Sequence, residues 1–105
     1  MLDIYPITLL VARDASLAAP RIQRHDPDLA RQLRKAAASV PLNTAEGAGN
    51  LGGHRKNRYA QALGSAREVG AIYDTAAAMG YLAEPAPEVR ARLHHVIAVL
   101  VKVTR

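Results

Sequence analysis

Residues 39–47 read Ser39-Val-Pro41-Leu-Asn43-Thr-Ala45-Glu46-Gly47, a stretch that interrupts an alanine-rich helical pattern with proline and small polar side chains. Pro41 cannot donate a backbone hydrogen bond to the carbonyl of Ala37. We therefore expect it to bend its helix, at a cost of about 3 kcal/mol if nothing compensates. Sequences keep such breaks mainly where another level of structure makes up for them. The polar side chains of this stretch should accordingly face a neighbouring helix that can satisfy them.

The sequence on both sides of this stretch predicts four amphipathic helices, because apolar residues recur at spacings of three and four. Asp26-Pro27-Asp28 is typical of a helix start, Gly80 of a helix end, and residues 47–53 are rich in glycine, as in a flexible connection. The expected helices run from about Tyr5 to Gln23, from Asp26 to about Gly47, from after the glycine-rich connection to near Gly80, and from about Glu88 through Val101. The predicted fold class is all-α, an up-down antiparallel four-helix bundle with a Pro-kinked second helix.

Four apolar stripes predict the core of this bundle. They consist of Ile7, Leu10, Val11 and Leu17; of Leu29, Leu33, Ala37 and Val40; of Tyr59, Leu63, Ala66, Val69, Tyr73 and Ala76; and of Val89, Leu93, Val96, Ile97, Leu100 and Val101.

The length of 105 residues suits one domain, residues 1–105, with a single core. Half of the residues are apolar, yet Phe, Trp and Cys are absent, so the core must be built from Ala, Leu, Val, Ile and Tyr. The lack of cysteine excludes disulfides and thiolate metal sites and fits a reducing compartment, which indicates the cytoplasm. Asp3 stands where a signal peptide needs basic residues, and no uncharged run approaches the ~18 apolar residues of a membrane span, so no membrane association is expected.

The stretch 39–47, followed by Tyr59 and by Ala62-Leu63-Gly64-Ser65-x-x-Glu68, resembles the signature of bacterial four-helix-bundle proteins. These include the proteins encoded by intervening sequences in large-subunit ribosomal RNA genes. The accessory variability proteins of diversity-generating retroelements are related to them in fold and pattern. The resemblance covers about residues 5–82.

The resemblance implies an up-down four-helix protomer that assembles into a ring, typically a homopentamer, and that is not known to be an enzyme. Retroelement members are basic rings that bind the reverse transcriptase and its template RNA. The resemblance also identifies the residues of a structural motif, which are Ser39, Pro41, Asn43, Glu46, Gly47, Gly64, Ser65 and Glu68.

The motif residues have structural interpretations that compete with a catalytic one. We expect Glu46 to be a buried acid that accepts hydrogen bonds from Ser65 or Tyr59, because buried charge needs such partners. Asn43 should bond to the backbone that Pro41 loosens, and Glu68 should pair with a basic neighbour or a facing helix. The alternative is an enzyme that uses Asn43, Glu46 and Ser65, but no His and Asp surround either serine in a recognisable arrangement, so no catalytic residue is predicted.

The net charge of +5 is unevenly distributed. Between residues 26 and 58, the sequence has three acidic residues, Asp26, Asp28 and Glu46, against six basic ones. Such a basic field attracts phosphate polyanions or acidic partners, although a solvated helix face explains it equally well. The candidate nucleic-acid-binding residues are Arg31, Arg34, Lys35, Arg55, Lys56 and Arg58.

No metal or cofactor site is predicted. His25, His54, His94 and His95 are the available ligands, but no Glu precedes a His by three residues, as di-metal bundles require. The spacing Gly47-x-Gly49-x-x-Gly52 matches a dinucleotide fingerprint but follows a helix rather than a strand, which argues against nucleotide binding.

The leading hypothesis is a non-enzymatic oligomeric helical bundle that acts as an accessory factor. It would bind structured nucleic acid (RNA or DNA), a nucleic-acid enzyme such as a reverse transcriptase, or both, through its basic surface. Without abundant aromatic stacking platforms, its binding should be shape-based and strongly salt-dependent. The alternative is a scaffold that docks an acidic protein and has no nucleic-acid role.

Overall fold

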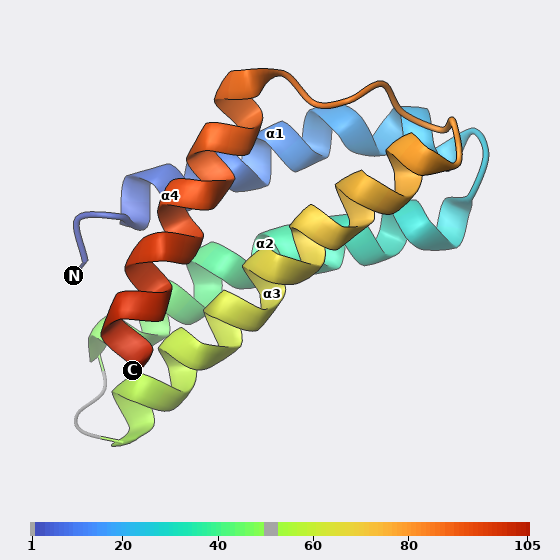
Figure 1. Ribbon diagram of the computed structural model, residues 1–105. Coiled ribbons are helices and arrows are strands. Elements are labelled where there is room, and N and C mark those ends of the chain that lie inside the picture. Colours follow the sequence, from blue (N-terminus) through green and yellow to red (C-terminus); the bar gives the residue numbers. More distant parts are fainter. Residues whose placement is uncertain (1, 50–52) are drawn as a thin grey trace.

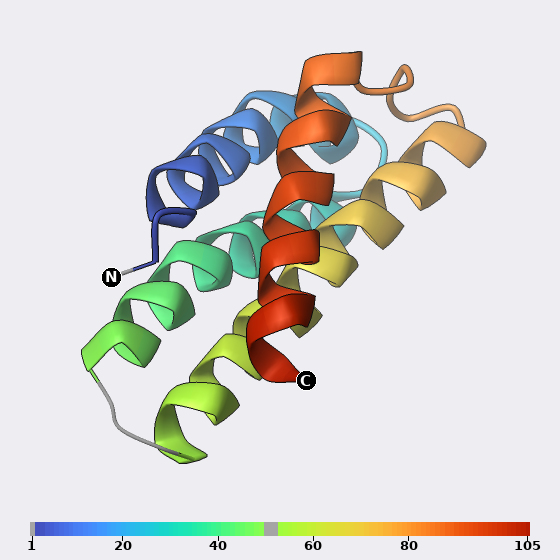
Figure 2. The same cartoon turned by 60° about the vertical axis from the view of Figure 1, so that its left-hand side comes forward.

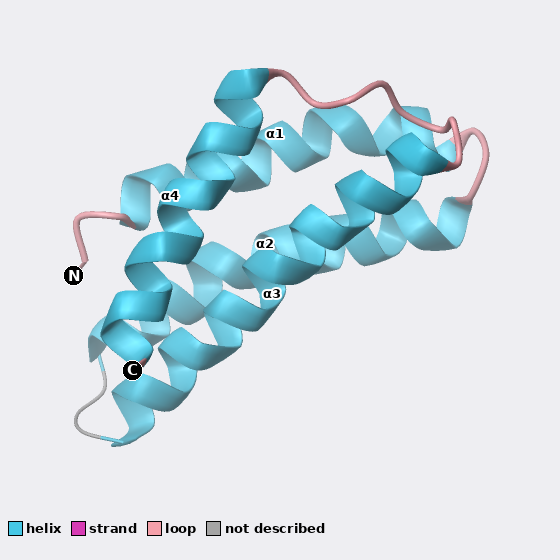
Figure 3. Ribbon diagram, in the orientation of Figure 1, coloured by secondary structure: helices cyan, strands magenta, loops and turns pink. Residues whose placement is uncertain are grey.

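The computed structural model of the protein describes residues 2–49 and 53–105, which form four α-helices (Figure 1). Helix α1 spans Tyr5–Gln23, α2 spans Pro27–Gly49, α3 spans Gly53–Ala78 and α4 spans Pro87–Thr104. Neither described range contains a β-strand (Figure 3). The predicted all-α fold class is therefore confirmed.

The ends of α2 and α3 are formed by the residues that the sequence indicated. The backbone N–H of Leu29 donates to Oδ1 of Asp26 at 3.0 Å, so Asp26 caps the start of α2. After α3, Gly80 has a φ of 76°, and the N–H of Tyr81 donates to the carbonyl of Ala76 at 2.8 Å. This is a Schellman ending, which places glycine in the left-handed conformation that it adopts most easily.

The four helices pack in a cycle of neighbours. Helix α2 contacts α1 and α3, while α4 contacts α3 and α1, in the up-down order of a four-helix bundle (Figures 1 and 2). The connection between α3 and α4, residues 79–86, runs back along the bundle before α4 begins (Figure 1). The ring of Tyr81 in this connection stacks on His25, with centroids 4.9 Å apart, and so ties it to the turn between α1 and α2.

The core confirms most of the predicted stripes. All six residues of the α3 stripe, from Tyr59 to Ala76, are buried. Ala15, Ala19, Ala30 and Ala66 are fully buried as well, so small side chains let the helices approach closely. Leu17 is the clear error, because 70% of it is exposed.

Helix α2 runs without interruption through Pro41, which is buried. Whether α2 bends at Pro41 stays a prediction. The expected flexible connection at residues 47–53 is wrong at both of its ends, because Gly47 and Gly49 belong to α2 and Gly53 begins α3. Residues 50–52 of that connection lie outside the described part of the chain.

Candidate nucleic-acid interface

A chain of polar side chains joins α2 to α3 within the motif. The hydroxyl of Ser65 donates to Oγ of Ser39 at 2.9 Å. The side-chain amide of Asn43 donates to the same Oγ at 2.8 Å and to the carbonyl of Ser39 at 3.0 Å. Asn43 therefore bonds to the carbonyl of Ser39, two residues before Pro41, and not to that of Ala37, which the prediction required. The expectation that polar residues of the motif find partners on a facing helix is met by Ser39 and Ser65.

Gly47 and Tyr59 form the second contact of the motif. Both are buried, and a Cβ atom added to Gly47 would overlap Cε1 of Tyr59 and lie 2.6 Å from its Cδ1. Glycine is therefore needed here for the close approach of an aromatic ring, rather than for a flexible turn. Gly64 differs, because a Cβ there would meet nothing within 4 Å. The structure gives no steric reason for that glycine.

The prediction that Glu46 is a buried acid is wrong. Its side chain is 60% exposed and forms an ion pair with Arg58 at 3.3 Å. Successive helical residues point about 100° apart, so a buried Gly47 turns Glu46 toward solvent. Ser65 donates to Ser39 instead, so Asn43 and Ser65 meet at Oγ of Ser39, while Glu46 pairs with Arg58 and does not join them.

The expected ion pair of Glu68 is also not found among the described residues. Its side chain is exposed and lies with Arg31 and Lys35 along a shallow groove between α2 and α3, beside Ser39 and Ser65.

The six candidate nucleic-acid-binding residues form two groups. The Ser39–Ser65 and Gly47–Tyr59 contacts fix the antiparallel register of α2 and α3. In this register, Arg31, Arg34 and Lys35 on α2 form one group, and Arg55, Lys56 and Arg58 near the start of α3 form the other. At 1.5 Å per residue, the first group lies about 18 Å or more along α2 from the end where α3 begins. Arg31 pairs with Asp28 at 2.8 Å, and its hydrogen bond holds the pKa of that carboxyl below its ordinary value.

Sequence reasoning missed two basic residues, Lys102 and Arg105, which the structure adds to the group on α3. Val103 of α4 shares a shallow cavity with Arg55, Lys56 and Tyr59, so the end of α4 meets the start of α3 (Figures 1 and 2). We call this region the basic end, and it comprises Arg55, Lys56, Arg58, Lys102 and Arg105. An up-down topology places the end of a fourth helix beside the start of the third. The two basic residues near the C-terminus could therefore have been assigned from sequence.

The electrostatics of the basic end suit an anion. The first turn of α3 carries no acidic residue, and the positive end of its helix dipole lies there. Arg58 pairs with Glu46, but the two side chains are 40% and 60% exposed, and pairs at the surface are weak. The guanidinium can therefore exchange this carboxylate for a phosphate.

A buried ion pair between α1 and α4 was also missed. Nε and Nη2 of Arg92 donate to the two carboxylate oxygens of Asp14, each at 2.8 Å. The Asp14 side chain is only 6% exposed, and its hydrogen bonds raise the pKa of Arg92. The sequence hint of this ion pair was the position of Asp14 near the apolar stripe of α1. Its partner Arg92 could not be identified locally, because it lies 78 positions away in sequence.

Within residues 2–49 and 53–105, no three His, Cys, Asp or Glu side chains gather as a metal site would require. In the same part of the chain, no helix is both long and apolar enough to cross a membrane.

Comparison with known proteins gives one family match. No curated protein sequence matches the chain significantly. The family model described as 23S rRNA-intervening sequence protein matches residues 10–102, which include all of α2 and α3 and most of α1 and α4. The four-helix architecture agrees with the bundle that the motif implied. The chain therefore belongs to the 23S rRNA-intervening sequence protein family.

Proposed function

We propose that this protein is a non-enzymatic accessory factor that binds structured RNA through its basic end, as a ring-forming homo-oligomer in the cytoplasm. The observation that carries the proposal is the meeting of the start of α3, which carries Arg55, Lys56 and Arg58, with the end of α4, where Lys102 and Arg105 lie in the sequence. The family name refers to intervening sequences of 23S rRNA, and structured RNA is therefore the first ligand to test.

Binding of this kind reads backbone shape rather than base sequence. Lysine and arginine neutralise phosphates, and the released counterions make affinity fall steeply with salt. Of the aromatic side chains that could stack on bases, Tyr59 and Tyr73 are buried in the core. A folded RNA, with closely spaced phosphates, suits such a surface better than an extended single strand.

Assembly into a ring would multiply this field. By the family resemblance, the ring has five protomers, and each carries a net charge of +5. Large apolar side chains on the protomer surface support assembly, because Leu9 is 47% exposed and Leu42 is 66% exposed. Repeated around a ring, both basic groups could contact one RNA at the same time.

A reverse transcriptase or another nucleic-acid enzyme is the protein partner that we propose alongside RNA, on the family resemblance. Such an enzyme would hold the same RNA, so that the ring and the enzyme meet on a shared ligand.

The proposal is tested by binding of the purified protein to a structured RNA and to a DNA duplex of equal length across a salt series. We expect RNA binding that persists at physiological salt and exceeds DNA binding. A steep salt dependence with no preference between the two would indicate only general attraction to polyanions.

The second candidate is a scaffold that docks an acidic protein. The exposed leucines favour it, because apolar side chains at the surface can be buried against a protein partner. Absence of RNA binding even at low salt, with an intact oligomer, would favour this candidate over the first.

A further inference from the structure

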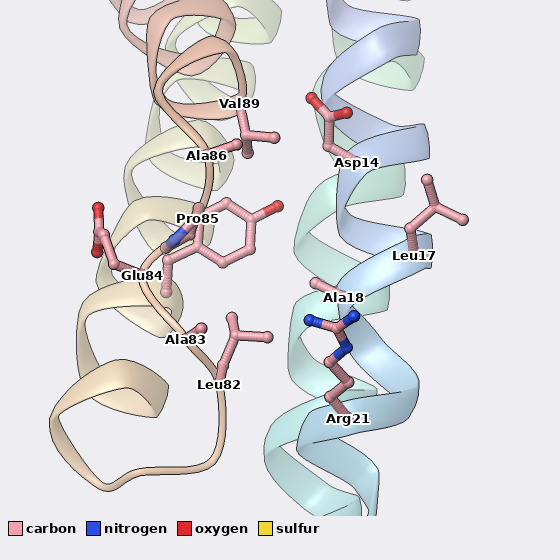
Figure 4. Close-up of a pocket in the computed structure, with 11 residues that line it drawn as sticks. Asp14, Leu17, Ala18, Arg21, Leu82, Ala83, Glu84, Pro85, Ala86 and Val89 are labelled. Atoms are coloured by element: carbon pink, nitrogen blue, oxygen red, sulfur yellow. The ribbon is translucent and has the colours of Figure 1, made fainter.

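A cavity of about 230 Å³ lies between α1 and the connection that leads into α4, far from the basic end. Figure 4 shows Asp14, Leu17 and Arg21 on one wall, facing Leu82 and Val89 on the other. The walls are mostly apolar, with a few polar groups between them, as is typical of small-molecule sites. The volume is below the ~300 Å³ of the smallest drug-sized pockets, so a ligand here must be small.

Tyr73 supplies a hydrogen-bonding group in this cavity that nothing else uses. The residue is 1% exposed, and its hydroxyl has no hydrogen-bond partner among the described residues. Tyr73 lines the cavity, and the charge of Asp14 on the opposite wall acts on its hydroxyl. Buried hydroxyls without a partner are rare in folded proteins, and each calls for an explanation.

Burial raises the pKa of Tyr73 to about 12, with a further contribution from Asp14. The hydroxyl therefore keeps its proton near neutral pH and can donate a hydrogen bond. The buried hydroxyl belongs to a side chain that lines the cavity.

Among the charged side chains that line the cavity, the one without a described partner is positive. Both oxygens of Asp14 accept hydrogen bonds from Arg92, and both oxygens of Glu84 accept hydrogen bonds from Arg90. Arg21 has neither an ion pair nor a hydrogen bond to any described side chain, and its guanidinium extends toward the cavity from α1 (Figure 4). An anion entering the cavity thus meets carboxylates that are already paired and one guanidinium that is not.

We propose that this cavity binds a small carboxylate with a compact apolar body, whose carboxylate accepts a hydrogen bond from the Tyr73 hydroxyl and pairs with Arg21. The apolar part of the ligand lies between Leu17, Leu82 and Val89. Residues 79–86, which contribute Leu82 to this wall, form no helix or strand. The site is separate from the basic end, and its occupation does not depend on RNA.

The test is a titration of the full chain with benzoate, followed by amide chemical shifts, with benzamide as the neutral probe of the same shape. Benzoate should shift amides of α1 near Asp14 and of residues 82–89, and benzamide should bind more weakly. Absence of these shifts, or equal binding of benzamide and benzoate, would overturn the proposal.

Two variants and one control separate a ligand site from a structural role. Tyr73→Phe and Arg21→Gln should each reduce benzoate affinity about tenfold, as expected for one hydrogen bond to a charged group. Arg13→Gln removes the same charge from an exposed position on the same helix and should leave affinity unchanged. Tyr73→Phe should also leave the melting temperature unchanged or higher, because it removes a hydroxyl that has no partner. Equal loss of affinity in Arg13→Gln, or full affinity in Tyr73→Phe, would contradict the site.

Discussion

The aromatic ring of Tyr59 on α3 lies directly against the backbone of Gly47 on α2, with no room for a side chain between them. This contact and the Ser39–Ser65 hydrogen bond lie eight positions apart on α2, so together they lock the register of the two helices. The motif at residues 39–47 therefore acts in the packing of α2 against α3. In the bundle, the start of α3, with Arg55, Lys56 and Arg58, lies beside the end of α4.

Gly47→Ala should destabilise the protein by about 1–2 kcal/mol. The added methyl group would clash with a buried ring, at a cost of about 1–3 kcal/mol, and the helix propensity of alanine would return up to ~1 kcal/mol. Denaturant unfolding measures the change. Gly64→Ala is the matched control, since it adds the same group where nothing lies within 4 Å and should stabilise by about 0.5–1 kcal/mol. Equal stabilisation by both substitutions would show that the ring does not occupy this position.

Asp14→Asn should lower the melting temperature by about 5 °C or more, because it removes one charge of a mostly buried pair and leaves Arg92 uncompensated. Calorimetry of the variant gives the shift. The control is Asp28→Asn, which breaks the exposed pair with Arg31 and should change the melting temperature little. Similar small effects in both variants would mean that the pair between α1 and α4 is not formed.

Glu84 should contribute to stability in a pH-dependent way. Two hydrogen bonds from Arg90, each 2.9 Å long, hold the pKa of Glu84 below its ordinary value of 4.5. Its contribution is therefore complete above about pH 4.5 and is lost as the pH falls through the lowered pKa. Urea midpoints of the wild type and Glu84→Gln should differ at pH 6 and converge toward pH 3. A difference that stays constant over this range would contradict the pairing.

Leu42→Glu should weaken the proposed oligomer, because a charge in an apolar contact between protomers must be desolvated on assembly. The native mass of the wild type should correspond to five protomers of 11.3 kDa each. The mass of the variant should fall, whereas Gln61→Glu, an exposed site on α3, should not change it. A monomeric wild type would contradict assembly itself, and an unchanged variant would exclude this part of α2 from the interface.

Sequence reasoning predicted the helices well because their apolar periodicity is strong. The α3 stripe from Tyr59 to Ala76 is wholly buried, and Asp26 and Gly80 end their helices as their local chemistry indicates. Local signals and tertiary packing agree at these positions.

The errors arose where packing overrode the local signal. Gly47 suggested a flexible connection, but a ring 12 positions later required glycine inside a helix. On α1, Asp14 is buried and Leu17 exposed, because Arg92 of α4 satisfies the acid in the core. The register of α2 and α3 separates the six candidate basic residues into two groups, and no local sequence pattern reveals this register. Lys102 and Arg105 are assigned to the basic end because the bundle topology places the end of α4 beside the start of α3.

The most direct test of the account is RNA binding by the triple variant of Arg55, Lys56 and Arg58 to Ala. Its comparator is the triple variant of Arg13, Arg24 and Arg67 to Ala, which removes equal charge from exposed positions away from the basic end. We expect only the first variant to weaken binding, with its native mass unchanged and its salt slope reduced by about one for each phosphate that is no longer neutralised. Equal weakening by both variants, or binding unaffected by the first, would contradict the assignment of the RNA interface to the basic end.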